Sequence, residues 1–211
     1  MTFFLINYIQ QLLKKPERKE REMAGKAIEM LMDEHQVILK VLGSMETMAD
    51  ALEKRERVER GTIKKYAEFL RNFADQCHHG KEEDRLFVKM IEHGFSTKEG
   101  PLAVMLREHE TGRSHVRALM AIGEKSGPLS AAESQETINH ARGFAELLRG
   151  HIAKEDRVLY GMAEKTIPAR EMEKMADDFE KFELEVTGEG AHEKWHALAH
   201  ELIKAYPSGT N

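Results

Sequence analysis

A pattern of histidines and carboxylates suited to metal binding occurs twice along this chain. Each copy begins with a Glu-His pair and continues, 42 or 43 residues after that histidine, with a His-x-x-x-Glu motif. The pairs are Glu34-His35 and Glu108-His109, and the motifs begin at His78 and His151. Aligned without gaps, the two motifs also share a lysine, a leucine and a final aromatic residue. Four helices that deliver these side chains to one place make a metal site.

The second motif, His151 with Glu155, is the clearer of the two. Residues four apart on a helix share one face, and Leu148 and Val158 on that face are apolar, so both polar side chains are expected to project into the core. A buried carboxylate needs a counter-charge or a metal. Imidazole and carboxylate ligands suit iron, manganese or zinc, and helical bundles build di-metal sites from such inward-facing residues.

His35 and His109 each lie on the apolar stripe of a predicted helix. A single histidine in that position is more often a core residue with satisfied hydrogen bonds than a ligand. Both follow a glutamate and both are paired with a His-x-x-x-Glu motif. Their interpretation as ligands therefore depends on the whole set.

The first motif leaves two pairs of ligands open. Alignment of the repeat selects His78 and Glu82, whereas helical phase, at about 100° per residue, favours His79 and Glu83. We favour the pair that the repeat selects and keep the other as the alternative. A local helix irregularity, of the kind found at functional sites, would reconcile the two.

Hydrophobic periodicity and turn residues predict the helices that carry these side chains. Four long helices are expected at about residues 23–52, 62–91, 102–125 and 131–166, the last with a capping box of Ser130 and Glu133. Short loops between them favour an all-α, antiparallel up-down four-helix bundle. After Pro168 we expect two further helices at about 169–186 and 191–206. The predicted divisions are an apolar lead and polar linker (1–22), the bundle (23–167) and a C-terminal helical extension (168–211).

Composition excludes several other kinds of protein. A formal net charge of −5 gives no reason to expect a nucleic-acid partner. The single cysteine, Cys77, rules out an internal disulfide and suits a reducing cytoplasm. The apolar start is too short to span a bilayer and lacks the features of a signal peptide. The terminal helices offer surfaces for a homodimer or a protein partner.

The ordered set of motifs resembles the hemerythrin-like HHE cation-binding family over roughly residues 27–165. The resemblance implies a non-haem di-iron centre, carboxylate- and oxo-bridged, in a four-helix bundle. Carried over by position, the metal ligands are His35, His78, Glu82, His109, His151 and Glu155.

One position departs from the oxygen-carrying members of that family, which use a second histidine four residues along the third helix. Here that residue is Arg113, interpreted as a surface charge rather than as a group that supports the ligands. The departure argues against reversible oxygen carriage and for a centre with open coordination that binds or reacts with O₂, H₂O₂ or NO in stress response or sensing. The alternatives are iron handling, iron–sulfur cluster repair, or a peroxidase or oxidase activity.

His192, His196 and His200 form a further stripe near the end of the chain. No carboxylate partner is apparent in the sequence at a matching position. We expect these residues at the margin of a helix that packs on the bundle. Cys77, close to the first motif, is expected to be a buried small apolar residue.

Overall fold

The computed structural model describes residues 25–208. The lead and linker expected over residues 1–22 lie outside the described residues. All the regular secondary structure in the described part of the chain is helical. No helix there combines the length and the apolar character needed to cross a bilayer.

The helices lie within about two residues of their predicted positions. The first is α3 (Gly25–Glu53), and the third is α6 (Gly100–Gly123). The second consists of α4 (Arg60–Phe69), η1 (Leu70–His79), η2 (Glu82–Leu86) and α5 (Phe87–Glu92), and the fourth of α7 (Ala131–Lys154), η3 (Glu155–Leu159) and α8 (Tyr160–Thr166). The extension forms α9 (Ala169–Val186) and α10 (Ala191–Ala205). Ser130 and Glu133 form the predicted capping box at the start of α7.

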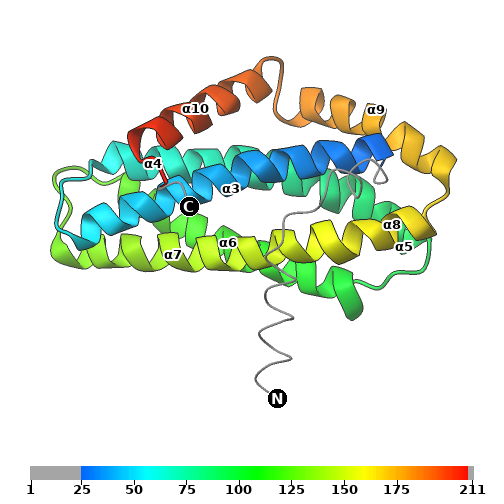
Figure 1. The fold of residues 1–211 in the computed structure, drawn as a ribbon, viewed down its shortest axis with the longest axis horizontal. Coiled ribbons are helices and arrows are strands. Elements are labelled where there is room, and N and C mark those ends of the chain that lie inside the picture. The colour runs from blue at the N-terminus through cyan, green and yellow to red at the C-terminus, as the bar shows by residue number, and fades with distance from the viewer. Residues whose placement is uncertain (1–24, 209–211) are drawn as a thin grey trace.

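The long helices lie side by side along the length of the molecule (Figure 1). Helix α3 packs on α7, and α6 packs on both α4 and α7. Helices α9 and α10 cover one side of this arrangement, where both contact α3. The extension therefore lies directly against the helices that carry the repeated motifs.

The buried apolar residues form two separate clusters, and the polar motifs lie between them. On α3, one cluster uses residues 27–32 and the other begins at Ile38, so that His35 falls in the gap. The same gap contains residues 78–83 on the second helix, His109 on the third, and His151 and Glu155 on the fourth. Apolar packing above and below therefore fixes one polar layer across all four helices.

The second and fourth helices are π-helical where they cross this layer. The segments η1 and η2 flank Gly80 and Lys81, and η3 begins at Glu155. A π-helical turn contains more residues than an α-helical one, so it changes which side chains face inward. Val158, expected on the buried face of its helix, is 50% exposed because it follows this change of phase.

Candidate metal centre

Seven histidine and glutamate side chains meet in the polar layer, and all are buried. Two groups have potential ligand atoms within 4.8 Å of one another. Group A is His79, Glu82, His109 and His151, and group B is His35, His78 and Glu155. All six residues selected by the repeat are present, together with one histidine of the alternative pair.

The second helix contributes both of its adjacent histidines, which neither predicted pair allowed for. His78 and His79 are consecutive, yet both are buried in the layer because η1 is π-helical there. Glu82 is buried with them, whereas Glu83 is in neither group and is partly exposed. The helix irregularity considered for this segment is therefore observed, and it changes the set of candidate ligands.

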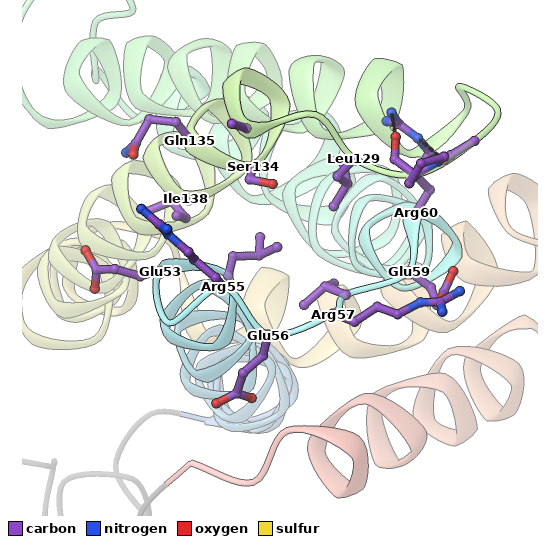
Figure 2. Close-up of a pocket in the computed structure, with 15 residues that line it drawn as sticks. Glu53, Arg55, Glu56, Arg57, Glu59, Arg60, Leu129, Ser134, Gln135 and Ile138 are labelled. Carbon is purple, nitrogen blue, oxygen red and sulfur yellow. Dashed lines mark hydrogen bonds and ion pairs between the residues drawn. The ribbon is translucent and has the colours of Figure 1, made fainter.

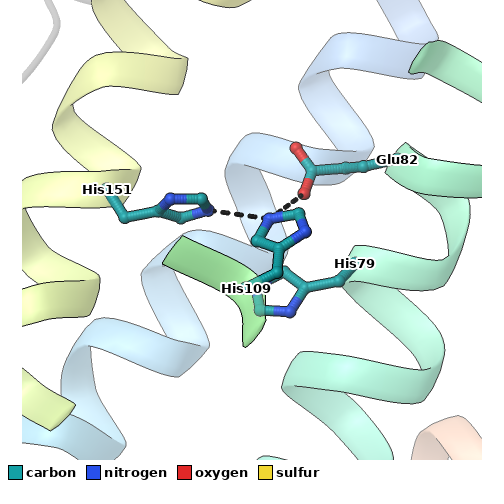
Figure 3. Close-up of side chains that lie close together, drawn as sticks. All are labelled: His79, Glu82, His109 and His151. Carbon is teal, nitrogen blue, oxygen red and sulfur yellow. Dashed lines mark hydrogen bonds and ion pairs between the residues drawn. The ribbon is translucent and has the colours of Figure 1, made fainter. Parts of the chain in front are cut away.

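Group A gathers side chains from the second, third and fourth helices (Figure 3). The rings of His79 and His109 are stacked with centroids 3.9 Å apart. His151 points at His109 from the fourth helix, with 3.0 Å between their Nε2 atoms. Glu82 closes the group, with its Oε2 atom 3.6 Å from His109 Nε2.

Glu155 extends between the two groups. Its Oε1 atom lies 2.9 Å from His151 Nε2, and its Oε2 atom lies 3.4 Å from His35 Nε2. Glu82 is placed similarly, since its Oε2 atom is also 3.8 Å from His78 Nε2. Both carboxylates are thus within reach of both groups, as a pair of bridging ligands would be.

Several atoms at the centre lack the hydrogen bonds that buried polar atoms normally make. Among the described residues, His78 Nε2, Glu82 Oε2 and both carboxylate oxygens of Glu155 have no hydrogen-bond partner. Lone pairs of nitrogen and oxygen that converge in one buried place are the arrangement a cation satisfies. The donor set therefore fits a pair of metal ions such as iron.

A carboxylate holds the opposite nitrogen of each imidazole. In all five cases Nδ1 donates to the carboxylate, at distances of 2.6–3.3 Å. The pairs are His35 with Asp156, His78 with Glu34, His79 with Asp75, His109 with Glu83, and His151 with Glu108. Such hydrogen bonds fix the tautomer and direct Nε2 toward a metal.

These outer carboxylates explain the repeated Glu-His pair. Glu34 accepts from His78 rather than from its neighbour His35, and Glu108 accepts from His151 rather than from His109. Each glutamate therefore orients the ligand that the next helix supplies. Sequence reasoning identified the pairs but not this role, although their repetition was a signal for it.

Arg113 is not the surface charge that we predicted. Its guanidinium donates to Asp75 across 2.9 Å and to Glu83 across 2.7 Å, and its side chain is only 29% exposed. Those carboxylates hold His79 and His109. Arg113 thus supports the outer carboxylates of group A, while His79 brings the number of imidazoles at the centre to five.

Burial and close contacts shift the protonation of the centre. Burial alone would lower the pKa of His35, but Asp156 and Glu155 raise it to about 9. Burial acts likewise on His151, where Glu155 and Glu108 raise the pKa to about 9. Burial and the nearby Glu155 raise the pKa of Glu82 well above its usual range. Without metal, protons therefore neutralise charge at atoms that metal ions would occupy.

Burial lowers the pKa of two other imidazoles, so that these nitrogens stay neutral and ready to bind a cation. The pKa of His78 falls well below its usual value because of burial and the nearby His35. The same is true of His79, which is buried beside His109.

Tyr160 adds a hydroxyl group beside the centre. It donates to Glu82 Oε1 across 2.9 Å and lies 3.4 Å from His35 Nε2. Burial, together with Glu82, raises its pKa well above the usual value. The hydroxyl therefore keeps its proton. The equivalent residue in the other repeat is Phe87, so the two halves of the centre differ here.

Two other features lie apart from the centre. A cavity of about 1300 Å³ opens between the end of α3 and the start of α7, and none of the candidate ligands lines it (Figure 2). On α10, the rings of His192 and His196 pack against Phe73, with centroids 6.1 Å and 5.5 Å away. The expectation that α10 packs on the bundle with these two histidines at its margin is confirmed, and the third, His200, is exposed.

Known proteins support a relationship that covers most of the chain. This chain is 24% identical over 170 residues to the uncharacterized proteins Rv1995 of Mycobacterium tuberculosis and Mb2018 of Mycobacterium bovis. The match covers 81% of this chain and 66% of each relative, slightly less than two thirds of their length. No solved structure matches.

A family model covers the whole polar layer. The model of the hemerythrin HHE cation-binding domain matches residues 26–163, which include all seven candidate ligands. The chain therefore belongs to the hemerythrin HHE cation-binding family.

Proposed function

We propose that this protein holds a non-haem di-iron centre in an antiparallel up-down-up-down four-helix bundle of residues 23–167, followed by a helical extension. One iron would take the group A ligands and the other the group B ligands, with Glu82 and Glu155 shared. The observation that carries the proposal is the convergence of unpartnered buried atoms of His78, Glu82 and Glu155. Family membership supports iron as the cation.

We propose further that the centre binds or reacts with O₂, H₂O₂ or NO. Bound iron would supply redox chemistry and exchangeable coordination positions. With Glu82 and Glu155 shared, group B offers two imidazoles and group A three, so group B leaves more room for a small molecule. Tyr160, which keeps its proton and lies beside both Glu82 and His35, would hold a hydrogen-bond donor next to that molecule.

The protein purified without added metal tests this proposal. We expect about two irons per chain and an oxo-bridge absorption that changes on exposure to O₂, H₂O₂ or NO. His151→Ala is expected to lose both features. Absence of metal, or zinc that ferrous iron does not replace, would remove the redox function.

A further inference from the structure

Lys81 is a fully buried cation at the junction of the second helix with the extension. Its side chain is 0% exposed, and its ammonium donates to Glu34 of α3 and to Glu183 of α9. A buried ammonium is costly unless it is fully paired. Burial alone would lower the pKa of Lys81, yet Glu34 and the other nearby groups raise it, so the charge is retained.

The oxygens of Glu34 and Glu183 and the sulfur of Cys77 lie within 4.8 Å of one another, as the ligands of a metal would. The ammonium of Lys81 already bridges the two carboxylates and takes the place of a cation. This cluster is therefore an ion-pair network. Its members come from α3, η1 and α9, so it ties the extension to the bundle.

The network leads to the candidate metal centre. Glu34 accepts from Lys81 with one oxygen and from His78 Nδ1 with the other, the latter across 2.8 Å. Glu183 holds Lys81 from the far side. A continuous chain of hydrogen bonds therefore joins α9 to an imidazole whose Nε2 atom is unpartnered among the described residues.

The other repeat lacks this connection. Lys154 donates to Glu108, which accepts from His151 across 2.8 Å, so the first two links are the same. Lys154, however, is 38% exposed, and no residue of the extension is paired with it in the described part of the chain. The third contact, from the lysine to a carboxylate of α9, is specific to the half of the centre that α9 covers.

Close packing against the second helix holds α9 next to Lys81. Phe179 and Phe182 are buried on the face that meets the bundle. A Cβ atom on Gly80 would lie 2.7 Å from Phe182 Cζ, so a residue without a side chain allows the approach. Glu183 follows Phe182 directly and is thereby brought to Lys81.

We propose that Glu183 is a positioning residue of the metal centre, which acts through Lys81 and Glu34 to hold the imidazole of His78. This makes α9, which lies beyond the region matched by the family model, part of the outer support of group B. The proposal rests on the proposed di-iron function. It predicts that a change on α9 alters metal binding without touching any ligand.

The test compares Glu183→Gln with Glu185→Gln, an exposed residue of the same helix whose substitution changes the charge equally. Loss of a direct partner of a metal-bound histidine typically costs 10–100-fold in affinity. Glu183 acts two contacts further out, so we expect a chelator to remove iron about 3–10-fold faster from Glu183→Gln. The visible spectrum of the Co²⁺-loaded protein should shift in the same variant, and Glu185→Gln should match the wild type in both measurements.

Cys77 provides a readout that needs no metal. It is buried, its sulfur lies close to Glu183, and it is the single cysteine of the chain. In the metal-free protein a thiol reagent should modify it several-fold faster in Glu183→Gln than in Glu185→Gln, because α9 is held less firmly.

Two outcomes would overturn the proposal while leaving the di-iron function intact. Loss of iron from His78→Ala would establish that function separately. One is an iron release rate in Glu183→Gln equal to that in Glu185→Gln. The other is faster release with an unchanged Co²⁺ spectrum and lower thermal stability, which would make Glu183 a purely structural residue. A wild-type protein that takes up no metal would overturn the proposed function as well.

Discussion

His35 donates a hydrogen bond from Nδ1 to Asp156 Oδ1 across 2.7 Å, although 121 positions separate the two residues. The corresponding contact in the other repeat joins His109 Nδ1 to Glu83 Oε1 across 2.6 Å. In both cases the acceptor directly follows a candidate bridging glutamate, Glu155 or Glu82. The two copies of the repeat therefore support each other's ligands, and neither could build the centre alone.

Removal of His151 tests the ligand assignment most directly. His151→Ala should lose most of its iron, because this imidazole contacts both His109 and Glu155. Metal that binds only the folded protein stabilises it by about 2.7 kcal/mol at a hundredfold excess over Kd. For a chain of this length we therefore expect the Tm of the iron-loaded sample to fall by about 5–10 °C.

Metal analysis and calorimetry on the same preparations check that prediction. His200→Ala is the matched control, since His200 is exposed on α10 and belongs to neither group. Equal iron content and Tm in the two variants would defeat the assignment of His151.

Substitution of His79 tests how many metal ions the centre binds. His79→Ala leaves group A with Glu82, His109 and His151, so we expect about one iron per chain to be lost or bound at least tenfold more weakly. In that background Arg113→His should recover part of the binding, because residue 113 lies one helical turn beyond His109 on the same face.

Titration with ferrous iron under anaerobic conditions measures both effects. His140→Ala, which changes a half-buried histidine outside both groups, should bind two irons normally. Two irons bound by His79→Ala with unchanged affinity would show that His79 is a neighbour of the centre and not a ligand.

The helices of this protein were predictable from sequence, because glycine, proline and capping residues mark their ends. Ser130 and Glu133, for example, fixed the start of α7 correctly. The register of the second helix was not predictable. The phase of the apolar residues and the repeat pointed to different histidines, and the π-helical turns that accommodate His78 and His79 together depend on packing between helices.

Contacts between residues that lie far apart in the sequence could not be predicted either. No sequence spacing indicates that His35 meets Asp156. The long side chain of Arg113 was predicted to reach solvent, whereas it turns to two carboxylates that the second helix places nearby. Patterns within one helix could therefore be predicted from the sequence, whereas the partners of each side chain on other helices could not.

The stability of the metal-free protein should fall as the pH rises from about 6.5 to about 9. Imidazoles in the unfolded chain have a pKa near 6.5, whereas His35 and His151 have folded-state values of about 9. The folded protein thus binds more protons in this window, and its unfolding free energy decreases as the pH increases. His78 and His79, whose pKa values are lowered, affect the pH dependence of the unfolding free energy only below about pH 6.5.

Urea denaturation at several pH values measures this slope. His151→Ala should reduce it, since one of the two groups is removed. Bound metal should reverse it, because metal competes with protons for the same nitrogens and binds more tightly as they leave. A metal-free protein that becomes more stable between pH 6.5 and 9 would contradict the raised pKa values.

The two lysines of the repeated motif should differ sharply in their effect on stability. Lys81 is fully buried between Glu34 and Glu183, whereas Lys154 is 38% exposed and, within residues 25–208, is paired with Glu108 alone. Removing one member of a buried ion pair leaves uncompensated charge and costs about 3 kcal/mol or more, but an exposed pair contributes about 1 kcal/mol or less. In urea denaturation of the metal-free protein, Lys81→Met should therefore be far less stable than Lys154→Met. Equal losses of stability in the two variants would mean that water reaches the ammonium of Lys81 and that α9 does not exclude it.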